Sequence, residues 1–142
     1  MTCAVTVLKT GMTLKKALRK IVIPGLRPRI TVDPTPSRVT VSLGGRVIAD
    51  TKSALTMREA GFPPVQYIPL EDVAPDVLEP SDHTSYCPFK GDATYYSLKV
   101  GDHVTQPAVW TYRAPYDEVA AIRDHVAFYP DRVDSIEVHD AA

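Results

Sequence analysis

The chain has 142 residues, of which 44% are hydrophobic and 23% are charged, a composition typical of one water-soluble globular domain. No apolar run approaches the roughly 20 residues that a membrane-spanning helix needs, so we expect no membrane span. Only Cys3 and Cys87 are present, which argues against a disulfide framework and favours a reducing, cytoplasmic setting.

The first part of the chain carries charge of one sign. Residues 1–32 contain seven Lys and Arg and no acid, whereas the rest contains nine basic and 17 acidic residues, a net charge of -8. The segment at about 13–23 has apolar residues on one helical face and lysines on the other, and Pro24 and Gly25 end it. We therefore predict a basic N-terminal extension, residues 1–28, followed by a single β-rich domain, residues 29–142. The negative charge of that domain argues against nucleic acid as its partner, and the natural start is either Met1 or Met12.

Two hairpins are predicted from glycine-containing turns. Hydrophobic and polar residues alternate over 39–43, and Gly44-Gly45 supplies the positive φ angles of a two-residue turn before residues 46–50 run back. The stretch 94–100 alternates in the same way, and Gly101-Asp102 suits a tight turn into 103–105. Residues 65–68, 109–112 and 133–138 are further predicted strands. Residues 53–59 fit either a strand or a single helical turn.

A segment near the C-terminus has a helical pattern. Pro115 suits a first helical position, two acids follow it, and Val119, Ile122 and Val126 recur at helical spacing. Consecutive hairpins without regular β-α alternation favour a mainly β (α+β) fold. We expect an antiparallel sheet curled into a small barrel or sandwich, one C-terminal helix at about 115–127 and a short basic N-terminal helix at about 13–23. Because sheet edges are commonly covered by a second copy, we also expect a homodimer.

Chemically active side chains are concentrated in residues 81–98, SDHTSYCPFKGDATYYSL. Groups that carry protons, act as nucleophiles or hold anions, separated by Pro and Gly, are typical of a loop at a pocket mouth. We therefore predict a catalytic set of His83, Cys87, Lys90 and Asp92. Cys87 is either a nucleophile activated by Lys90 or His83, or a small buried hydrophobe. Lys90 and Asp92 either present a phosphate or carboxylate site or form a surface turn.

No metal or other cofactor is expected. A structural zinc site needs four ligands, and beyond His83 and Cys87 the sequence adds only the distant His103.

The same run and its flanks resemble the bacterial family catalogued as domain of unknown function 427. The matching segments are 44–51 (GGRVIADT), 67–73 (YIPLEDV), 78–97, 110–112 (WTY) and 127–133 (AFYPDRV), so the likeness covers about 29–138. The family is catalogued in places as nucleotidyltransferase-like, and that chemistry needs a Gly-Ser turn followed by paired acids for two metals. This chain has no Asp-x-Asp pair, and Asp50 after Gly44-Gly45 is a single carboxylate.

Tyrosines outnumber phenylalanines seven to three, and aromatic residues gather after residue 66. An apolar ring with a polar tip suits a ligand pocket. Tyr67 and Trp110 lie in family-like segments, and Tyr95 points away from the expected core face of its strand. The expected ligand-binding set is therefore Tyr67, Tyr95 and Trp110, with the carboxylates Asp50, Glu59 and Asp72 as acid or base partners.

These residues favour a protein that binds a small, anionic molecule in a loop pocket at residues 83–92, and they leave open whether it also catalyses a reaction. A non-catalytic β-rich assembly or binding module is the alternative, and nucleotidyl transfer is a weaker one.

Overall fold

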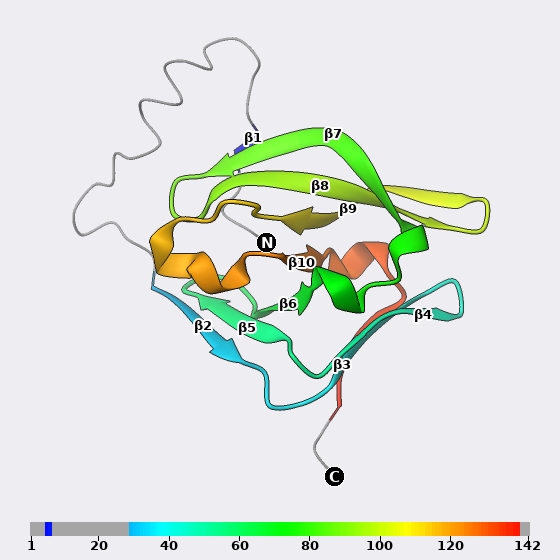
Figure 1. Ribbon diagram of the computed structural model, residues 1–142, viewed down its shortest axis with the longest axis horizontal. Coiled ribbons are helices and arrows are strands. Elements are labelled where there is room, and N and C mark those ends of the chain that lie inside the picture. Colours follow the sequence, from blue (N-terminus) through cyan, green and yellow to red (C-terminus); the bar gives the residue numbers. More distant parts are fainter. Residues whose placement is uncertain (1–4, 7–28, 140–142) are drawn as a thin grey trace.

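The computed structural model describes residues 5–6 and 29–139, which form short antiparallel strands joined by tight connections (Figure 1). The strands are β1 (Val5–Thr6), β2 (Ile30–Pro34), β3 (Val39–Leu43), β4 (Arg46–Thr51), β5 (Leu55–Glu59), β6 (Val65–Pro69), β7 (Leu78–Cys87), β8 (Gly91–Val100), β9 (His103–Thr111), β10 (His125–Phe128) and β11 (Ser135–Val138). The helical elements are 3-10 turns: η1 (Leu70–Asp72), η2 (Pro75–Val77), η3 (Asp117–Ile122) and η4 (Pro130–Arg132).

Two sheets make up the fold. The large sheet has the order β1-β7-β8-β9-β10-β6-β5-β2, the small sheet has the order β11-β3-β4, and the strand pairs are antiparallel. The mainly β, antiparallel prediction is confirmed. Of the predicted barrel or sandwich, the closed barrel is wrong, because neither sheet closes on itself within residues 5–6 and 29–139.

Each face of the large sheet carries its own hydrophobic cluster. On the outer face, Ile68, Leu98 and Val109 pack against Val39 and Val41 of the small sheet. The opposite face, called the inner face here, carries a second cluster that is rich in aromatic rings: Met57, Tyr67, Cys87, Ala93, Tyr95, Trp110, Tyr112, Val119, Ile122 and Ala127. Because side chains alternate along a strand, neighbours such as Tyr67 and Ile68 serve opposite clusters.

Both predicted hairpins are confirmed. Gly44 and Gly45 have φ angles of 62° and 76° and connect β3 to β4, and Gly101, with φ 60°, lies in the turn between β8 and β9. Residues 55–59 resolve the ambiguous segment as strand β5. The predicted strands at 65–68, 109–112 and 133–138 correspond to β6, the end of β9 and β11.

The predicted helix at 115–127 is wrong. Two 3-10 turns occupy 117–122 and are separated by a non-helical Val119 (φ -127°, ψ 26°). Asp124 has a φ of 62°, and Val126 then pairs with both β9 and β6. The apolar spacing arose because Val119 and Ile122 pack on the inner face while Val126 packs on the outer one. The predicted N-terminal helix at 13–23 lies outside the described residues, and the boundary at residue 29 stays a prediction.

The large sheet bends between β10 and β6, which pair only through His125 with Pro69 and Val126 with Ile68. β7, β8 and β9 lie on one side of this bend, and β6, β5 and β2 lie on the other (Figure 1).

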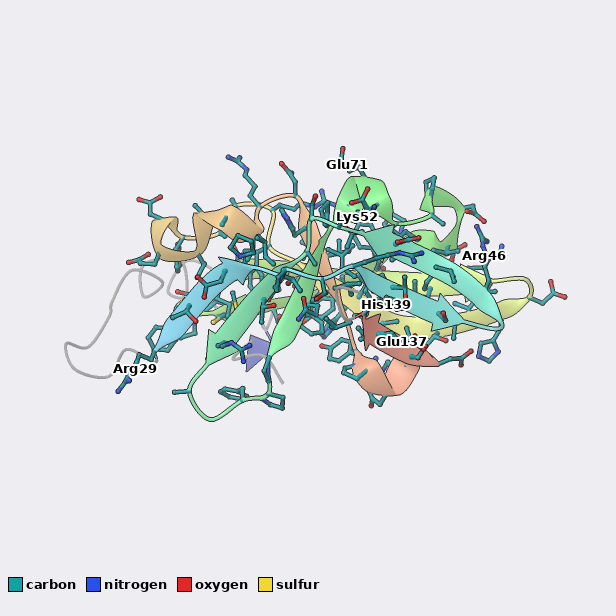
Figure 2. All side chains as sticks on the ribbon, turned by 90° about the horizontal axis from the view of Figure 1, so that it is seen from below. Arg29, Arg46, Lys52, Glu71, Glu137 and His139 are labelled. Carbon is teal, nitrogen blue, oxygen red and sulfur yellow. The ribbon has the colours of Figure 1, made fainter. Side chains whose placement is uncertain are left out.

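Charged side chains such as Arg46, Lys52 and Glu71 extend from the periphery (Figure 2). Among the described residues, no helix has the length and apolarity needed to cross a membrane.

Candidate functional site

The predicted pocket loop is mostly a β-hairpin. β7 continues to Cys87 and β8 starts at Gly91, which leaves only residues 88–90 as the turn. Gly91 has a φ of 116°, and a Cβ atom there would lie 3.3 Å from the carbonyl oxygen of Ala114. The turn is thus fitted closely against the segment that follows β9. The Tyr116 amide in that segment donates a hydrogen bond to the Lys90 carbonyl oxygen at 2.9 Å.

The four predicted catalytic side chains do not form one set. Cys87 and Lys90 are fully buried, and His83 is half-buried with its ring 4.4 Å from that of Tyr95. Asp92 is exposed and alternates with Ala93 of the inner face, so it points away from that face. Cys87 is also disulfide-bonded, a bond that the sequence did not lead us to expect, and in this form it has no thiolate.

Lys90 forms an ion pair with Glu59. Its Nζ atom donates to Glu59 Oε1 at 2.7 Å, and the side chains are only 1% and 6% exposed. Glu59 ends β5, whereas Lys90 precedes β8, and three strands separate β5 from β8 in the sheet order. The pair therefore connects the two halves of the bent sheet at the end that η3 flanks (Figure 1).

The three predicted aromatic residues come together on the inner face. Trp110 Nε1 donates to the Tyr67 hydroxyl at 3.1 Å, with the rings edge to face and their centroids 6.4 Å apart. Tyr95 lies directly opposite Trp110 in the β8–β9 register. Tyr129 joins them, with ring centroids 4.7 Å from Trp110 and 6.5 Å from Tyr95. His83, Tyr95, Tyr129, Trp110 and Tyr67 thus form a continuous row of rings that is half-buried at His83 and Tyr129.

Tyr112 is a further member of this site, and its hydroxyl has no hydrogen-bond partner among the described residues although the residue is 0% exposed. Burial raises its pKa above the ordinary range, and nearby Tyr67, Tyr95, Glu59 and Tyr129 raise it further. Burial likewise raises the pKa of Tyr67. Both phenols are therefore protonated at neutral pH. We call Glu59, Tyr67, Lys90, Tyr95, Trp110 and Tyr112 the inner cluster.

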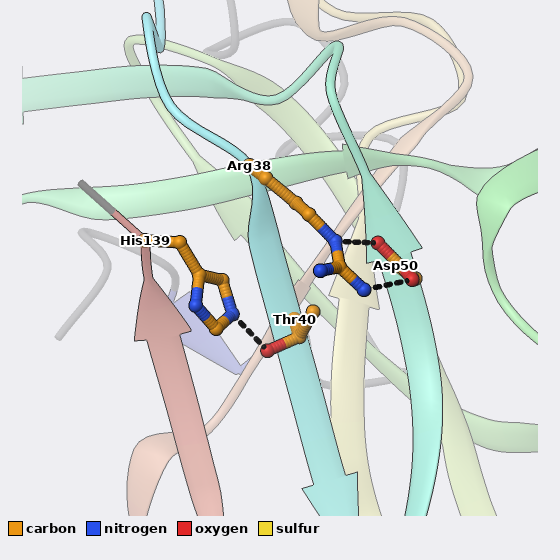
Figure 3. Close-up of polar contacts among 4 residues, drawn as sticks. All are labelled: Arg38, Thr40, Asp50 and His139. Carbon is orange, nitrogen blue, oxygen red and sulfur yellow. Dashed lines mark hydrogen bonds and ion pairs between the residues drawn. The ribbon is translucent and has the colours of Figure 1, made fainter. Parts of the chain in front are cut away.

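The other two predicted carboxylates lie outside the inner cluster. Asp50 accepts hydrogen bonds from Arg38 Nε and Nη2 at 2.7 and 2.6 Å on the small sheet, next to Thr40 and His139 (Figure 3). This guanidinium holds the pKa of Asp50 below its usual value. Asp72 accepts a hydrogen bond from Thr51 Oγ1 at 2.7 Å. Their contacts are those of structural polar residues.

The inner cluster offers one paired charge, several phenols and an indole, which can hydrogen-bond and stack on a polar organic molecule. Among residues 5–6 and 29–139, no three His, Cys, Asp or Glu side chains lie close enough together to hold a metal ion.

Sequence reasoning missed Tyr112 and Tyr129 as site residues. A signal for Tyr112 was present, since it lies two residues after Trp110 and must share its face in a strand. Tyr129 likewise lies two residues after Ala127, which belongs to the inner face, but the helix predicted at 115–127 concealed this strand alternation.

A family model described as Domain of unknown function (DUF427) matches residues 31–139. No curated protein matches the chain.

Proposed function

Because the chain belongs to the DUF427 family, whose description assigns no activity, we propose from its own geometry that it binds a small polar molecule at the inner cluster. Aromatic side chains with polar tips, gathered around a few fixed hydrogen-bonding groups, are the usual lining of a ligand site. The half-buried His83 and Tyr129 give this lining a side that faces solvent.

The observation that carries the proposal is the Tyr112 hydroxyl. A buried polar group without a partner costs about 1–3 kcal/mol, so such groups are rare in native proteins unless a water or ligand completes them. Burial, followed by the charges of Tyr67, Tyr95, Glu59 and Tyr129, raises the pKa of this hydroxyl, so it stays a hydrogen-bond donor. A ligand atom placed among these groups would accept a hydrogen bond from the Tyr112 hydroxyl.

The buried ion pair bears on the charge of the ligand. The anionic ligand that the sequence favours depended on an available Lys90 ammonium group. That ammonium donates to Glu59 instead, so the charge it offers to a ligand is balanced nearby. We therefore propose a ligand whose buried part is polar but uncharged. Catalysis by His83, Cys87, Lys90 or Asp92 stays a prediction, and the inner cluster supports binding more directly than turnover.

A thermal-shift screen of metabolites tests this function, using wild type, Tyr112→Phe and Thr94→Val. The Thr94 hydroxyl also has no partner but lies on a neighbouring position of β8 that faces away from Tyr95, so it is a matched control. A ligand at 100 times its dissociation constant stabilises by about 2.7 kcal/mol, which is roughly 8 °C for a chain of this size. We expect this shift in wild type and Thr94→Val and a clearly smaller one in Tyr112→Phe. A screen without hits, or hits that shift Tyr112→Phe fully, would refute the proposal.

The alternative of an assembly module has one supporting observation. β11 is an edge strand of the small sheet, and its last residue, Val138, is 47% exposed. Pairing of β11 with β11 of a second copy would cover that edge. Light scattering after size exclusion measures the mass directly, and a monomer at micromolar concentration would exclude the homodimer.

A further inference from the structure

A depression of about 320 Å³ lies on the surface away from the inner cluster, between the end of β3, the start of β9 and the segment that includes η4. Its apolar lining comes from Leu43 and Val133, which are 9% and 8% exposed. Its polar lining consists of His103, Thr105, Asp131, Arg132 and Asp134. None of these residues was predicted as part of a binding site.

Two of the charged groups are held in place by the fold. The Asp134 carboxylate accepts a hydrogen bond from the Gly44 amide at 2.8 Å, which fixes it at the β3–β4 turn. The Arg132 guanidinium lies 4.9 Å from the centroid of the Tyr129 ring, and its Nη1 atom donates to the carbonyl oxygen of Pro107. Groups held in this way lose little conformational entropy when a ligand binds.

The remaining charged or titratable groups of the depression face solvent. His103 and Asp131 are both exposed, one at the β8–β9 turn and the other in η4. The depression therefore combines two carboxylates with a guanidinium and an imidazole. A ligand with one charge would meet groups of its own sign, whereas a ligand with both charges can be matched at both ends.

We propose that this depression binds a small zwitterion, such as an amino acid, whose ammonium group lies at Asp131 and Asp134 and whose carboxylate lies at Arg132 and His103. The volume is at the lower end of the range for ligand sites, about 300–1,000 Å³, which suits a molecule of this size. An arginine side chain is well shaped to hold a carboxylate through two parallel hydrogen bonds. This site shares no lining residue with the inner cluster, although Arg132 packs on Tyr129 of the neighbouring row of rings. The proposal stands whether or not the inner cluster binds a ligand.

The test is an NMR titration of the isotope-labelled full chain with the common amino acids and γ-aminobutyrate at millimolar concentration. Butyrate and butylamine serve as probes that carry only one of the two charges. The Gly44 amide is the main reporter, because it is bonded to the Asp134 carboxylate. We expect saturable shifts of this amide with at least one zwitterion and much weaker binding of both single-charge probes.

Variants at the exposed positions complete the test without disturbing the core. Asp131→Asn and His103→Gln should each weaken binding about tenfold or more, because each removes a charge-assisted contact. Asp102→Asn is the matched control, since Asp102 is an exposed neighbour of His103 that does not line the depression. Absence of saturable binding by every zwitterion, equal binding of butyrate or butylamine, or unchanged affinity in both variants would overturn the proposal.

Discussion

Replacing Lys90 with methionine should strongly destabilise the protein. The substitution removes an ammonium group that is 2.7 Å from Glu59 Oε1 and leaves that carboxylate buried without its partner. Removing one member of a buried ion pair typically costs about 3–5 kcal/mol, out of a total stability of about 5–15 kcal/mol for a domain. Glu59→Met should cost a similar amount, because it removes the carboxylate that the buried Lys90 ammonium contacts at 2.7 Å.

The double variant distinguishes this reasoning from a simple loss of contacts. When both members become apolar, no buried charge is left, and such replacements are often neutral or stabilising. We therefore expect Lys90→Met with Glu59→Met to recover most of the stability that each single variant loses. The coupling between the two positions should be several kcal/mol.

Urea unfolding followed by circular dichroism measures these differences. With a slope of about 2 kcal/mol per molar urea, a loss of about 4 kcal/mol lowers the midpoint by about 2 M. The control is the half-exposed pair of Lys99 and Glu79, 3.8 Å apart, whose replacement by methionine should cost less than about 1 kcal/mol. Single variants at Lys90 and Glu59 as mild as this control, or a double variant whose loss equals the sum of the single losses, would refute the reasoning.

Three further predictions concern other parts of the molecule. Tyr67→Phe should lower the free energy of unfolding by about 1–3 kcal/mol, because Trp110 Nε1 loses its acceptor. Tyr112→Phe should not lower it in the absence of ligand, because that hydroxyl makes no hydrogen bond to a described residue. Urea unfolding compares the two variants, and an equal loss would contradict the contacts described. Asp76 forms an ion pair with Arg46 at 2.8 Å, Asp50 forms one with Arg38 at 2.6 Å, and each guanidinium lowers the pKa of its carboxyl partner. These ion pairs therefore contribute stability above the ordinary carboxyl pKa of about 4 and lose it as pH falls through the lowered values. A variant with both aspartates as Asn should therefore lose less stability than wild type between neutral and acidic pH in low salt, and matching pH profiles would contradict this. Gly91→Ala should lower the melting temperature more than Gly45→Ala. Both glycines have a positive φ, but only at Gly91 would the new Cβ lie close to backbone, 3.3 Å from the carbonyl oxygen of Ala114. Equal losses of melting temperature would show that this close approach is unimportant.

Local signals in the sequence were sufficient for the hairpins. A two-residue turn with positive φ angles almost requires glycine, so Gly44-Gly45 and the alternating residues around it identify β3 and β4. The helix at 115–127 failed because apolar residues at helical spacing can also serve two faces of a sheet. Val119 and Val126 do so here, and pairing of Val126 with β9 and β6 outweighs the local helical preference.

The candidate site was predicted only in part, for a similar reason. Tyr67, Tyr95 and Trp110 were selected by residue type, by the family-like segments and by a face of β8 expected to lie opposite the core. The structure brings the three together, but it buries that face of β8 in a second hydrophobic cluster. The partner of Lys90 could not be predicted in this way, because Glu59 is 31 residues away and reaches it only through the bend of the large sheet. Local spacing instead suggested Asp92, which the strand alternation turns outward.

Because the junction between β10 and β6 is short, a few side chains have a large part in holding the two halves of the large sheet together. Only two residue pairs connect the backbones of β10 and β6. The spacing between the two halves of the sheet therefore depends largely on side-chain bonds between them, from Trp110 to Tyr67 and from Lys90 to Glu59. The side chains proposed to contact a ligand are therefore also the ones that hold the two halves of the sheet together. A substitution at these positions would therefore change the spacing between the two halves of the sheet together with the hydrogen-bonding groups of the inner cluster.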